Sequence, residues 1–263
     1  MDAIKTTSLR GGYDKTVIIP GLDLALPQGK ITSIIGSNGC GKSTLLKTIG
    51  RIIPSLGGEI AINDRPIGEM KNKDIAKELA ILPQSPSAPG TLTVRELVGY
   101  GRFPYKKGFG LLNEEDNSII DWALEATGTA PFASRPISAL SGGQRQRVWI
   151  AMALAQKTGI IFLDEPTTYL DLSHQLEVLE LLAKLNKEEG STIVMVLHDL
   201  NLAAKYSDFL VAMKEGEIFR YGTVEEVMKE DTLKECFGIR GVIGEDAYTH
   251  KPICVSYELL EKK

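Results

Sequence analysis

The sequence has few cysteines and no excess of positive charge. Its three cysteines, Cys40, Cys236 and Cys254, are odd in number, far apart and without CxxC spacing. This pattern argues against a disulfide framework or a zinc site, and it fits a reducing compartment. The formal net charge is −4, so no strong basic field attracts nucleic acid. We therefore expect no nucleic-acid partner.

Long apolar runs are missing as well. The first residues, 1–12, have neither the apolar core nor the cleavage pattern of a signal peptide. The longest apolar runs, such as Ile193–Leu197, are far shorter than the roughly 20 residues that cross a bilayer. If the protein serves a membrane, we expect it to do so by docking. Its 263 residues have room for one large domain or two modest ones.

The order of the elements predicts an α/β fold. Residues 1–30 alternate polar and apolar residues between turn signals, which is typical of antiparallel strands. A β-branched run, 31–35, leads through a glycine-rich turn into a helical pattern at 42–49. From 86 to 154 the pattern is helical with loops, and a buried strand at 160–163 restores the α/β alternation. We predict a mixed α/β core that is interrupted by a helical insertion of about 86–158.

The last hundred residues continue this alternation. A helix is expected over 173–189, a strand over 192–197, a hairpin at 214–216 and a helix near 225–229. The cassette is expected to span 1–238, and no role is predicted for the short tail, 239–263.

The strongest local signal is a glycine-rich loop between the strand at 31–35 and the helix at 42–49. It matches the phosphate-binding pattern GxxxxGK[ST], whose chance occurrence is about one per hundred chains of this length. Its glycines let backbone N–H groups point at phosphate oxygens, Lys42 reaches the β- and γ-phosphates, and the Ser43 hydroxyl can bind Mg²⁺. The predicted phosphate-binding residues are Gly36, Ser37, Asn38, Gly39, Cys40, Gly41, Lys42, Ser43 and Thr44.

A second motif places two carboxylates at the end of the buried strand 160–163. Ligands of α/β sheets bind at the carboxyl ends of the strands. Asp164 can hold Mg²⁺ there, and Glu165 can polarise an attacking water. An apolar strand that ends in Asp-Glu is commonly structural, but its position downstream of the phosphate-binding loop favours the functional interpretation.

The third motif is Leu140-Ser141-Gly142-Gly143-Gln144, ahead of a predicted helix over 144–156. A turn or a helix N-cap explains Ser-Gly-Gly equally well, and such a helix start is also a phosphate site. Here the resemblance becomes specific, since LSGGQ is the signature of the ABC ATPase family. The order of loop, signature and Asp-Glu strand resembles that family from about residue 3 to about 235. The resemblance implies a P-loop NTPase core with an N-terminal antiparallel β-subdomain and an inserted α-helical subdomain.

Other family positions can be matched one by one. Gln84 resembles the Q-loop glutamine that senses Mg²⁺ and water, Asp171 the D-loop aspartate, and His198 the switch histidine that contacts the γ-phosphate. Tyr13 occupies the place of the aromatic residue that stacks on adenine, although a tyrosine between strands is often only packing. With Glu165 and Lys42, Gln84 and His198 make up the expected catalytic set; Ser43, Gln84 and Asp164 are the expected metal ligands.

The resemblance also implies an assembly. Family members face each other head to tail, with ATP between the phosphate-binding loop of one chain and the signature of the other. Ser141, Gly142, Gly143 and Gln144 would therefore act on the nucleotide of a second copy. The implied cofactors are ATP and Mg²⁺. The implied partners are integral-membrane permease subunits with an extracytoplasmic substrate-binding protein, and the implied location is the cytoplasmic face of the membrane.

Three kinds of ABC protein are possible: a transporter ATPase, a soluble protein of DNA repair or chromosome organisation, and a translation-type protein. Lys42 and Ser141 are too close for the coiled coil of the second kind, and one cassette argues against the third. The lack of a fused membrane domain favours an importer, although some exporters are also split. The stretches 101–105, 167–172 and 198–204 resemble iron-siderophore, haem and cobalamin uptake ATPases. We expect iron(III)-siderophore import, with cobalamin or haem as alternatives.

Three further expectations concern single segments. The resemblance implies that the segment 85–105 docks the membrane subunit, with an ordinary surface loop and helix as the alternative. Because the segment follows Gln84, the nucleotide state could reach it directly. Tyr169 stands where many family members have a smaller residue. Cys40 stands at a helix N-terminus, which can lower the pKa of a thiol. We therefore expect a maleimide to inactivate the enzyme and ATP to protect it.

Overall fold

The computed structural model of the chain describes residues 1–14, 16–106, 111–168 and 170–260. It divides into two compact units, one formed by residues 1–69 with 192–263 and the other by residues 70–191. The α/β class and the antiparallel β-subdomain are as predicted. The narrower insertion of about 86–158 stays a prediction, since the second unit also contains two strands and a long helix outside that range.

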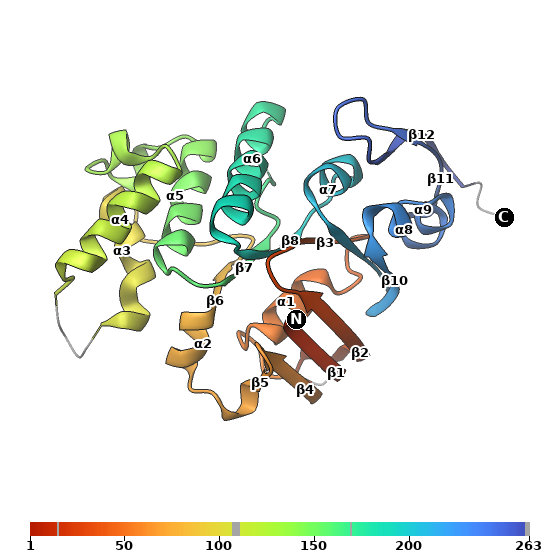
Figure 1. Cartoon of the computed structure of the whole chain (residues 1–263), viewed down its shortest axis with the longest axis horizontal. Coiled ribbons are helices and arrows are strands. Elements are labelled where there is room, and N and C mark those ends of the chain that lie inside the picture. The colour runs from red at the N-terminus through yellow and green to blue at the C-terminus, as the bar shows by residue number, and fades with distance from the viewer. Residues whose placement is uncertain (15, 107–110, 169, 261–263) are drawn as a thin grey trace. The chain divides into compact units, whose positions relative to one another are not determined.

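The first unit carries most of the strands (Figure 1). Its elements are β1 (Asp2–Tyr13), β2 (Thr16–Pro27), β3 (Ile31–Gly36), α1 (Lys42–Ile49), β4 (Gly57–Ile62), β5 (Arg65–Pro66), η1 (Ile67–Glu69), β8 (Thr192–Val196), α7 (Leu200–Tyr206), β9 (Phe209–Lys214), β10 (Glu217–Thr223), α8 (Val224–Val227), α9 (Glu230–Phe237), β11 (Ile239–Glu245) and β12 (Pro252–Leu259). Strands β4 and β5 were not anticipated.

Strand β3 is the centre of this unit. All six of its residues are buried, and β8 and β9 pair with it in parallel on its two sides. Strand β10 follows antiparallel to β9, as the predicted hairpin at 214–216 requires. A strand that is covered on both faces takes apolar residues at most positions, as β8 does, whereas β3 also buries the polar side chains of Thr32 and Ser33.

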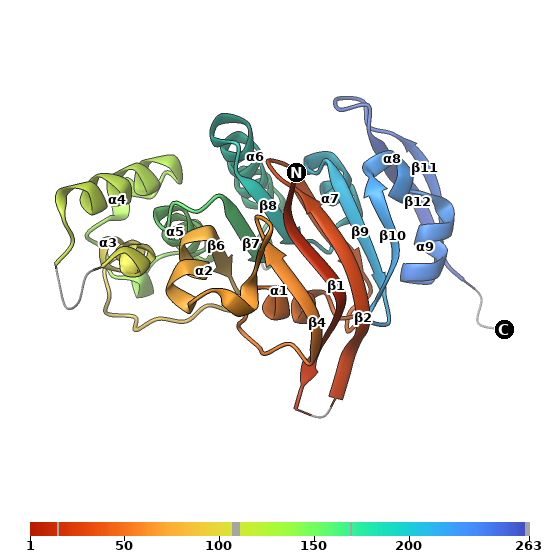
Figure 2. The ribbon, with the colours of Figure 1, turned by 60° about the horizontal axis from the view of Figure 1, so that its bottom comes forward.

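The N-terminal strands form a separate antiparallel sheet in the order β2-β1-β4-β5 (Figure 2). Strands β1 and β2 have 12 residues each, longer than the short strands that the turn signals suggested. The tail is a third sheet, the hairpin of β11 and β12.

The second unit is mainly helical. Its elements are α2 (Asn72–Glu78), β6 (Leu79–Leu82), α3 (Val94–Gly99), η2 (Tyr100–Tyr105), α4 (Glu114–Ala126), η3 (Ala130–Phe132), η4 (Ile137–Ala139), α5 (Gly142–Ala155), β7 (Ile160–Asp164) and α6 (Leu172–Glu189). Strands β6 and β7 run parallel, with Leu82 opposite Leu163. Among the described residues, every helix is too short or too polar to cross a membrane.

A buried ion pair fixes the helical part of this unit. Arg102 donates from Nε to Asp116 Oδ1 at 2.8 Å and from Nη1 to the carbonyl of Ala155 at 2.9 Å. Both charged side chains are buried, and the guanidinium lies 3.9 Å from the centre of the Tyr105 ring. Arg102 thus connects η2, α4 and the end of α5.

Candidate functional site

The phosphate-binding loop joins β3 to α1 in the first unit. Gly36, at its start, has a φ of 149°, and a Cβ there would lie 2.4 Å from the carbonyl oxygen of Met213 and 2.8 Å from Cys40 Sγ. No other residue fits that position without displacing β9. The glycine therefore lets the loop turn tightly out of the strand, as the pattern predicted.

Lys42 places a buried cation inside the loop. Its side chain donates to the carbonyl oxygens of Gly36 at 2.8 Å and of Ser37 at 2.9 Å, and the residue is only 5% exposed. Helix α1 begins at Lys42 without a capping side chain at Gly41 and without an acidic residue in its first turn. A buried ammonium beside an uncapped helix N-terminus fits an anion such as a phosphate chain. The Ser43 hydroxyl and the Asp164 carboxylate are oxygen donors of the kind that Mg²⁺ takes.

The pKa of the Cys40 thiol is not lowered, contrary to expectation, and this argues against the predicted reactivity toward maleimide. The residue is buried, and this burial raises the pKa of its thiol by more than the nearby Lys42 charge and the hydrogen bonds from Lys42 and its own backbone lower it. The reason is packing. The sulfur lies under the loop, against Gly36 and 3.9 Å from Lys42 Nζ, and no thiolate is favoured there.

In the second unit, β7 is wholly buried and ends at Asp164, itself only 3% exposed. Glu165 follows with a φ of 56°, a left-handed conformation that is uncommon outside glycine. Its Oε2 accepts hydrogen bonds from Gln84 Nε2 at 2.7 Å and from Thr168 Oγ1 at 2.9 Å. The sequence predicted Gln84 and Glu165 separately, and the parallel pairing of β6 and β7 brings them together. Thr168 was missed, although it lies three residues after Glu165.

The signature turn starts α5. Ser141 is its N-cap and forms a capping box with Gln144: the Gln144 N–H donates to Ser141 Oγ at 3.3 Å, and the Ser141 N–H donates to Gln144 Oε1 at 3.1 Å. The helix therefore starts at Gly142, slightly before the predicted start. The N-cap interpretation of the motif is confirmed, whereas a phosphate site at the same helix N-terminus stays a prediction.

Asp171 caps α6, the long helix after the D-loop. Its Oδ1 accepts from the His174 N–H at 3.0 Å, from Ser173 Oγ at 2.9 Å and contacts His174 Nδ1 at 2.7 Å. The hydrogen bonds from the His174 backbone, the His174 ring and Ser173, in that order, lower the pKa of the carboxyl to about 2. Tyr169 lies outside the described residues.

His174 also touches the signature turn. A Cβ on Gly143 would lie 2.8 Å from His174 Cδ2, so the imidazole lies directly over the Gly143 backbone. No sequence pattern had pointed to this residue. One signal was available, since the chain has only three histidines and this one stands three positions after the D-loop aspartate.

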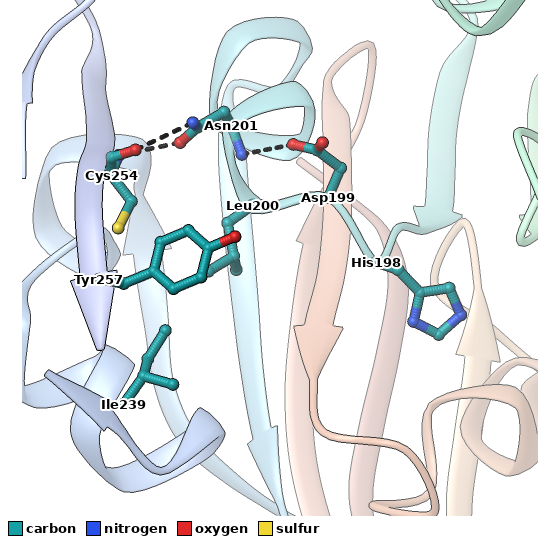
Figure 3. A pocket seen from close by; sticks show the side chains of 7 residues that line it. All are labelled: His198, Asp199, Leu200, Asn201, Ile239, Cys254 and Tyr257. Atoms are coloured by element: carbon teal, nitrogen blue, oxygen red, sulfur yellow. Dashed lines mark hydrogen bonds between the residues drawn. The ribbon is translucent and has the colours of Figure 1, made fainter. Parts of the chain in front are cut away.

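His198 follows β8 in the first unit and is exposed. The Leu197 N–H donates to the Ile34 carbonyl at 3.3 Å, which holds the end of β8 beside β3. Asp199 then caps α7, with Oδ1 accepting the N–H groups of Asn201 and Leu202, both at 2.9 Å. Hydrogen bonds thus hold the residues on both sides of His198 in place. Its ring points away from the Tyr257 ring (Figure 3).

A pocket of about 270 Å³ lies between α7 and the C-terminal hairpin, lined by His198, Asp199, Leu200, Asn201, Ile239, Cys254 and Tyr257. Figure 3 shows how Asn201 bridges to the hairpin. Its Nδ2 donates to the Cys254 carbonyl at 3.1 Å, and the Cys254 N–H donates to Asn201 Oδ1 at 2.8 Å. Lys251 Nζ donates to the carbonyls of Lys205 at 3.1 Å and Ser207 at 2.5 Å. The hairpin therefore holds α7 at both ends.

Tyr13 is the last residue of β1, opposite Thr16, and its side chain is 43% exposed. An exposed ring at a strand end can stack on a base, and its role stays a prediction.

Comparison with known proteins gives consistent findings. A family model described as ABC transporter matches residues 19–168. The iron(3+)-hydroxamate import ATP-binding protein FhuC of Bacillus subtilis is 57% identical over 263 residues, covering 100% of this chain and 98% of that protein. The achromobactin transport ATP-binding protein CbrD of Dickeya dadantii is 48% identical, covering 98% of this chain and 96% of that protein. The dimeric post-hydrolysis structure of the ATP-binding cassette MJ0796, bound to ADP and Pi, is 30% identical with a TM-score of 0.73, covering 84% of this chain and 98% of that one.

Proposed function

The chain belongs to the ABC transporter family of ATP-binding subunits, and from this premise we propose that it hydrolyses ATP to drive the import of iron(III)-siderophore complexes. The premise rests on the family match over 19–168 and on relatives whose length this chain covers almost completely. The proposed cargo is supported by the names of those relatives, which handle iron(3+)-hydroxamate and achromobactin. Cobalamin and haem, the other cargoes considered from the sequence, find no such support among the relatives cited above.

The observation that carries the hydrolytic function is the hydrogen bond between Gln84 and Glu165. A carboxylate held by two donors at the end of a buried strand is oriented to accept a proton from water. Lys42, buried in the phosphate-binding loop, supplies the fixed positive charge that the transferring phosphoryl group needs. His198, held between β8 and the cap of α7, is the proposed contact to the γ-phosphate.

Magnesium completes the proposed site. Ser43, Asp164 and Gln84 would hold Mg²⁺, which supplies charge neutralisation on the β- and γ-phosphates. The proposed role of the phosphate-binding loop is to hold the nucleotide through Gly36, Ser37, Asn38, Gly39, Cys40, Gly41, Lys42, Ser43 and Thr44. Tyr13 is the proposed stacking partner of adenine.

Two copies are proposed to close around the nucleotide, head to tail. The dimeric cassette MJ0796 with bound ADP and Pi supports a dimer in this family. In that arrangement, the helix N-terminus at Ser141, with Gly142, Gly143, Gln144 and the D-loop Asp171, acts on the nucleotide held by the second copy. A γ-phosphate that bridges two chains couples hydrolysis to opening, because hydrolysis removes the bridge.

Membrane subunits are the proposed partners, at the cytoplasmic face of the membrane, together with an extracytoplasmic substrate-binding protein. A pocket of about 280 Å³ in the second unit supports a dock within the predicted segment 85–105. It is lined by Pro86, Ser87, Ala88, Gly90, Ile137, Ser138, Arg145 and Trp149. The pocket begins two residues after Gln84, so a partner seated there is close in sequence to the residue that holds Glu165.

Sizing of the Glu165→Gln variant by light scattering tests the proposed site. We expect ATP binding to be kept, turnover to fall by orders of magnitude, and a shift from monomer to dimer only when Mg-ATP is added. Wild-type turnover in this variant would remove Glu165 from its role. For the cargo, cells that depend on this chain should take up radioactive iron as a siderophore complex and lose that uptake with Glu165→Gln. Loss of cobalamin or haem uptake instead would overturn the siderophore assignment.

A further inference from the structure

Two motifs that begin different helices meet at one side chain in the second unit. The imidazole of His174, in the first turn of α6, contacts Asp171 on one side and Gly143 on the other. An ideal Cβ on Gly143 would lie 2.8 Å from His174 Cδ2, 3.1 Å from Cγ and 3.3 Å from Nε2. The ring thus covers the backbone of the signature turn. Further along the same helices, Arg147 and Glu177 form an ion pair at 3.4 Å.

The chemistry of the contact to Asp171 is defined. A carboxylate with a pKa of about 2 is ionised at neutral pH and only accepts hydrogen bonds, so His174 Nδ1 must carry the proton. The 2.7 Å separation from Oδ1 is that of a charge-assisted hydrogen bond. This bond fixes the ring plane, and the ring plane in turn fixes how closely α6 approaches Gly143.

We propose that His174 is a positioning residue that ties the D-loop to the signature turn, so that Asp171 and Ser141 are presented together to the nucleotide of the second copy. This inference rests on the proposed head-to-tail dimer. The two motifs lie on different helices, α5 and α6, and the imidazole touches the backbone of one and the carboxylate of the other. This double contact of the imidazole holds the signature turn and the D-loop in a fixed arrangement on the surface that faces the partner.

The position of His174 argues against a role in stability alone. Its side chain is 37% exposed, and surface ion pairs contribute little to folding. Without the ring, Asp171 still caps α6 through the backbone N–H of residue 174 and through Ser173 Oγ. Variants at position 174 are therefore expected to fold with α6 intact.

Two substitutions separate the two contacts. His174→Asn keeps a donor near the place of Nδ1 but loses the ring over Gly143. His174→Phe keeps a ring but loses the hydrogen bond to Asp171. We expect each to lower kcat about tenfold with the KM for ATP unchanged, because small errors in the position of catalytic groups are costly. The matched control is His250→Ala, which removes a histidine that pairs with Glu245 at 2.6 Å in the C-terminal hairpin. Wild-type kcat in both variants would overturn the proposal.

Linked dimers test on which nucleotide His174 acts. In one dimer, His174→Ala is in the first copy and Lys42→Ala in the second; in the other, both changes are in one copy and its mate is wild type. If His174 acts across the interface, the first dimer keeps one complete site and hydrolyses ATP about tenfold faster than the second. If it acts on its own nucleotide, the order reverses, and the proposal is wrong.

Ser141→Ala in place of His174→Ala separates this inference from the proposed function. If the two Ser141→Ala dimers differ in hydrolysis rate as expected for action across the interface, but the two His174→Ala dimers have equal rates, the head-to-tail dimer stands and the proposed role of His174 is wrong. If Ser141→Ala also fails to give that order, the proposed two-chain site itself is wrong. The linked dimer with Lys42→Ala alone is the reference for a single working site.

Discussion

Gln84 and Glu165, 81 residues apart in the chain, are joined by a hydrogen bond of 2.7 Å between Nε2 and Oε2. They meet because each follows one of two neighbouring parallel strands, β6 and β7, whose carboxyl ends lie at the same edge. The amide N–H donates to Oε2 and so fixes the direction of the Glu165 carboxyl group, the group proposed as the general base.

Removal of the Gln84 amide should show how far hydrolysis depends on the orientation of Glu165. In Gln84→Ala we expect kcat for ATP hydrolysis to fall roughly tenfold or more, because Glu165 Oε2 loses the hydrogen bond from the amide and retains the one from the Thr168 hydroxyl. ATP binding, followed with a fluorescent nucleotide in the absence of Mg²⁺, should be unchanged. Thr168→Val is the companion variant, and we expect the double change to be more severe than either single change. Unaltered kcat in Gln84→Ala would show that the hydrogen bond has no part in hydrolysis.

The three thiols should be unreactive in the folded chain. Burial raises the pKa of Cys40 and Cys254, and it raises that of Cys236 to about 11. A thiol with a raised pKa is protonated at pH 7, and only the thiolate reacts. We expect negligible maleimide labelling at pH 7 and faster labelling as the pH rises above 9. Mass spectrometry should find three labels after unfolding in urea, and rapid labelling of native Cys40 at pH 7 would contradict this.

Asp171 should remain ionised far into the acid range. Its pKa is lowered to about 2, whereas an unfolded aspartate titrates near 3.9. A lowered folded pKa means that the ionised carboxylate adds stability above about pH 3.9, and that this contribution disappears as the pH falls through about 2. Carbon-13 NMR of the carboxyl should show this titration. In His174→Ala the pKa should move up toward the ordinary value, and an unchanged pKa would mean that the ring contributes nothing to it.

The Arg102–Asp116 pair should be the most sensitive polar contact of the helical region. Burial raises the pKa of Asp116, but the hydrogen bonds from Arg102 and the Asn113 backbone and the positive charge of Arg102 outweigh it, so the net shift is downward. Removal of one partner leaves a buried charge. We expect Arg102→Ala to lower the free energy of unfolding by about 3–5 kcal/mol. Urea denaturation measures this, and the exposed pair of Lys214 and Glu235 offers a control, Lys214→Ala, with a far smaller effect.

The sequence was most informative where local chemistry and tertiary structure demand the same residues. The turn after β3 needs glycine at position 36, where φ is 149°, and the strand that precedes it places Ile31, Ile34 and Ile35 in the core. Both features were therefore predicted, with the bounds of α1 correct at both ends. Strands β4, β5 and β6 and helix α2 were not anticipated. They are short, and β4 begins with two glycines and shows no regular alternation of buried and exposed residues.

The other predictions that failed depend on contacts between residues far apart in the chain, which no local sequence pattern specifies. Cys40 has the helix N-terminus that lowers a thiol pKa, but the packing of β9 against Gly36 buries it, and that packing involves residues far along the chain. His174 was missed for the same reason. The function that we infer for it depends on contact with Gly143, 31 positions earlier. The residue pattern of α6 does not predict this contact.

The hydrogen bonds between the C-terminal hairpin and α7 have an evolutionary consequence. Asn201 binds Cys254 only through the backbone N–H and carbonyl of that residue. Position 254 can therefore exchange its side chain for any other that fits, with proline excluded because it lacks the N–H. Position 201 has no such freedom, since it must both donate and accept from one short side chain. Descendants of this chain should thus vary more at position 254 than at position 201, where they should retain an amide three residues after the histidine.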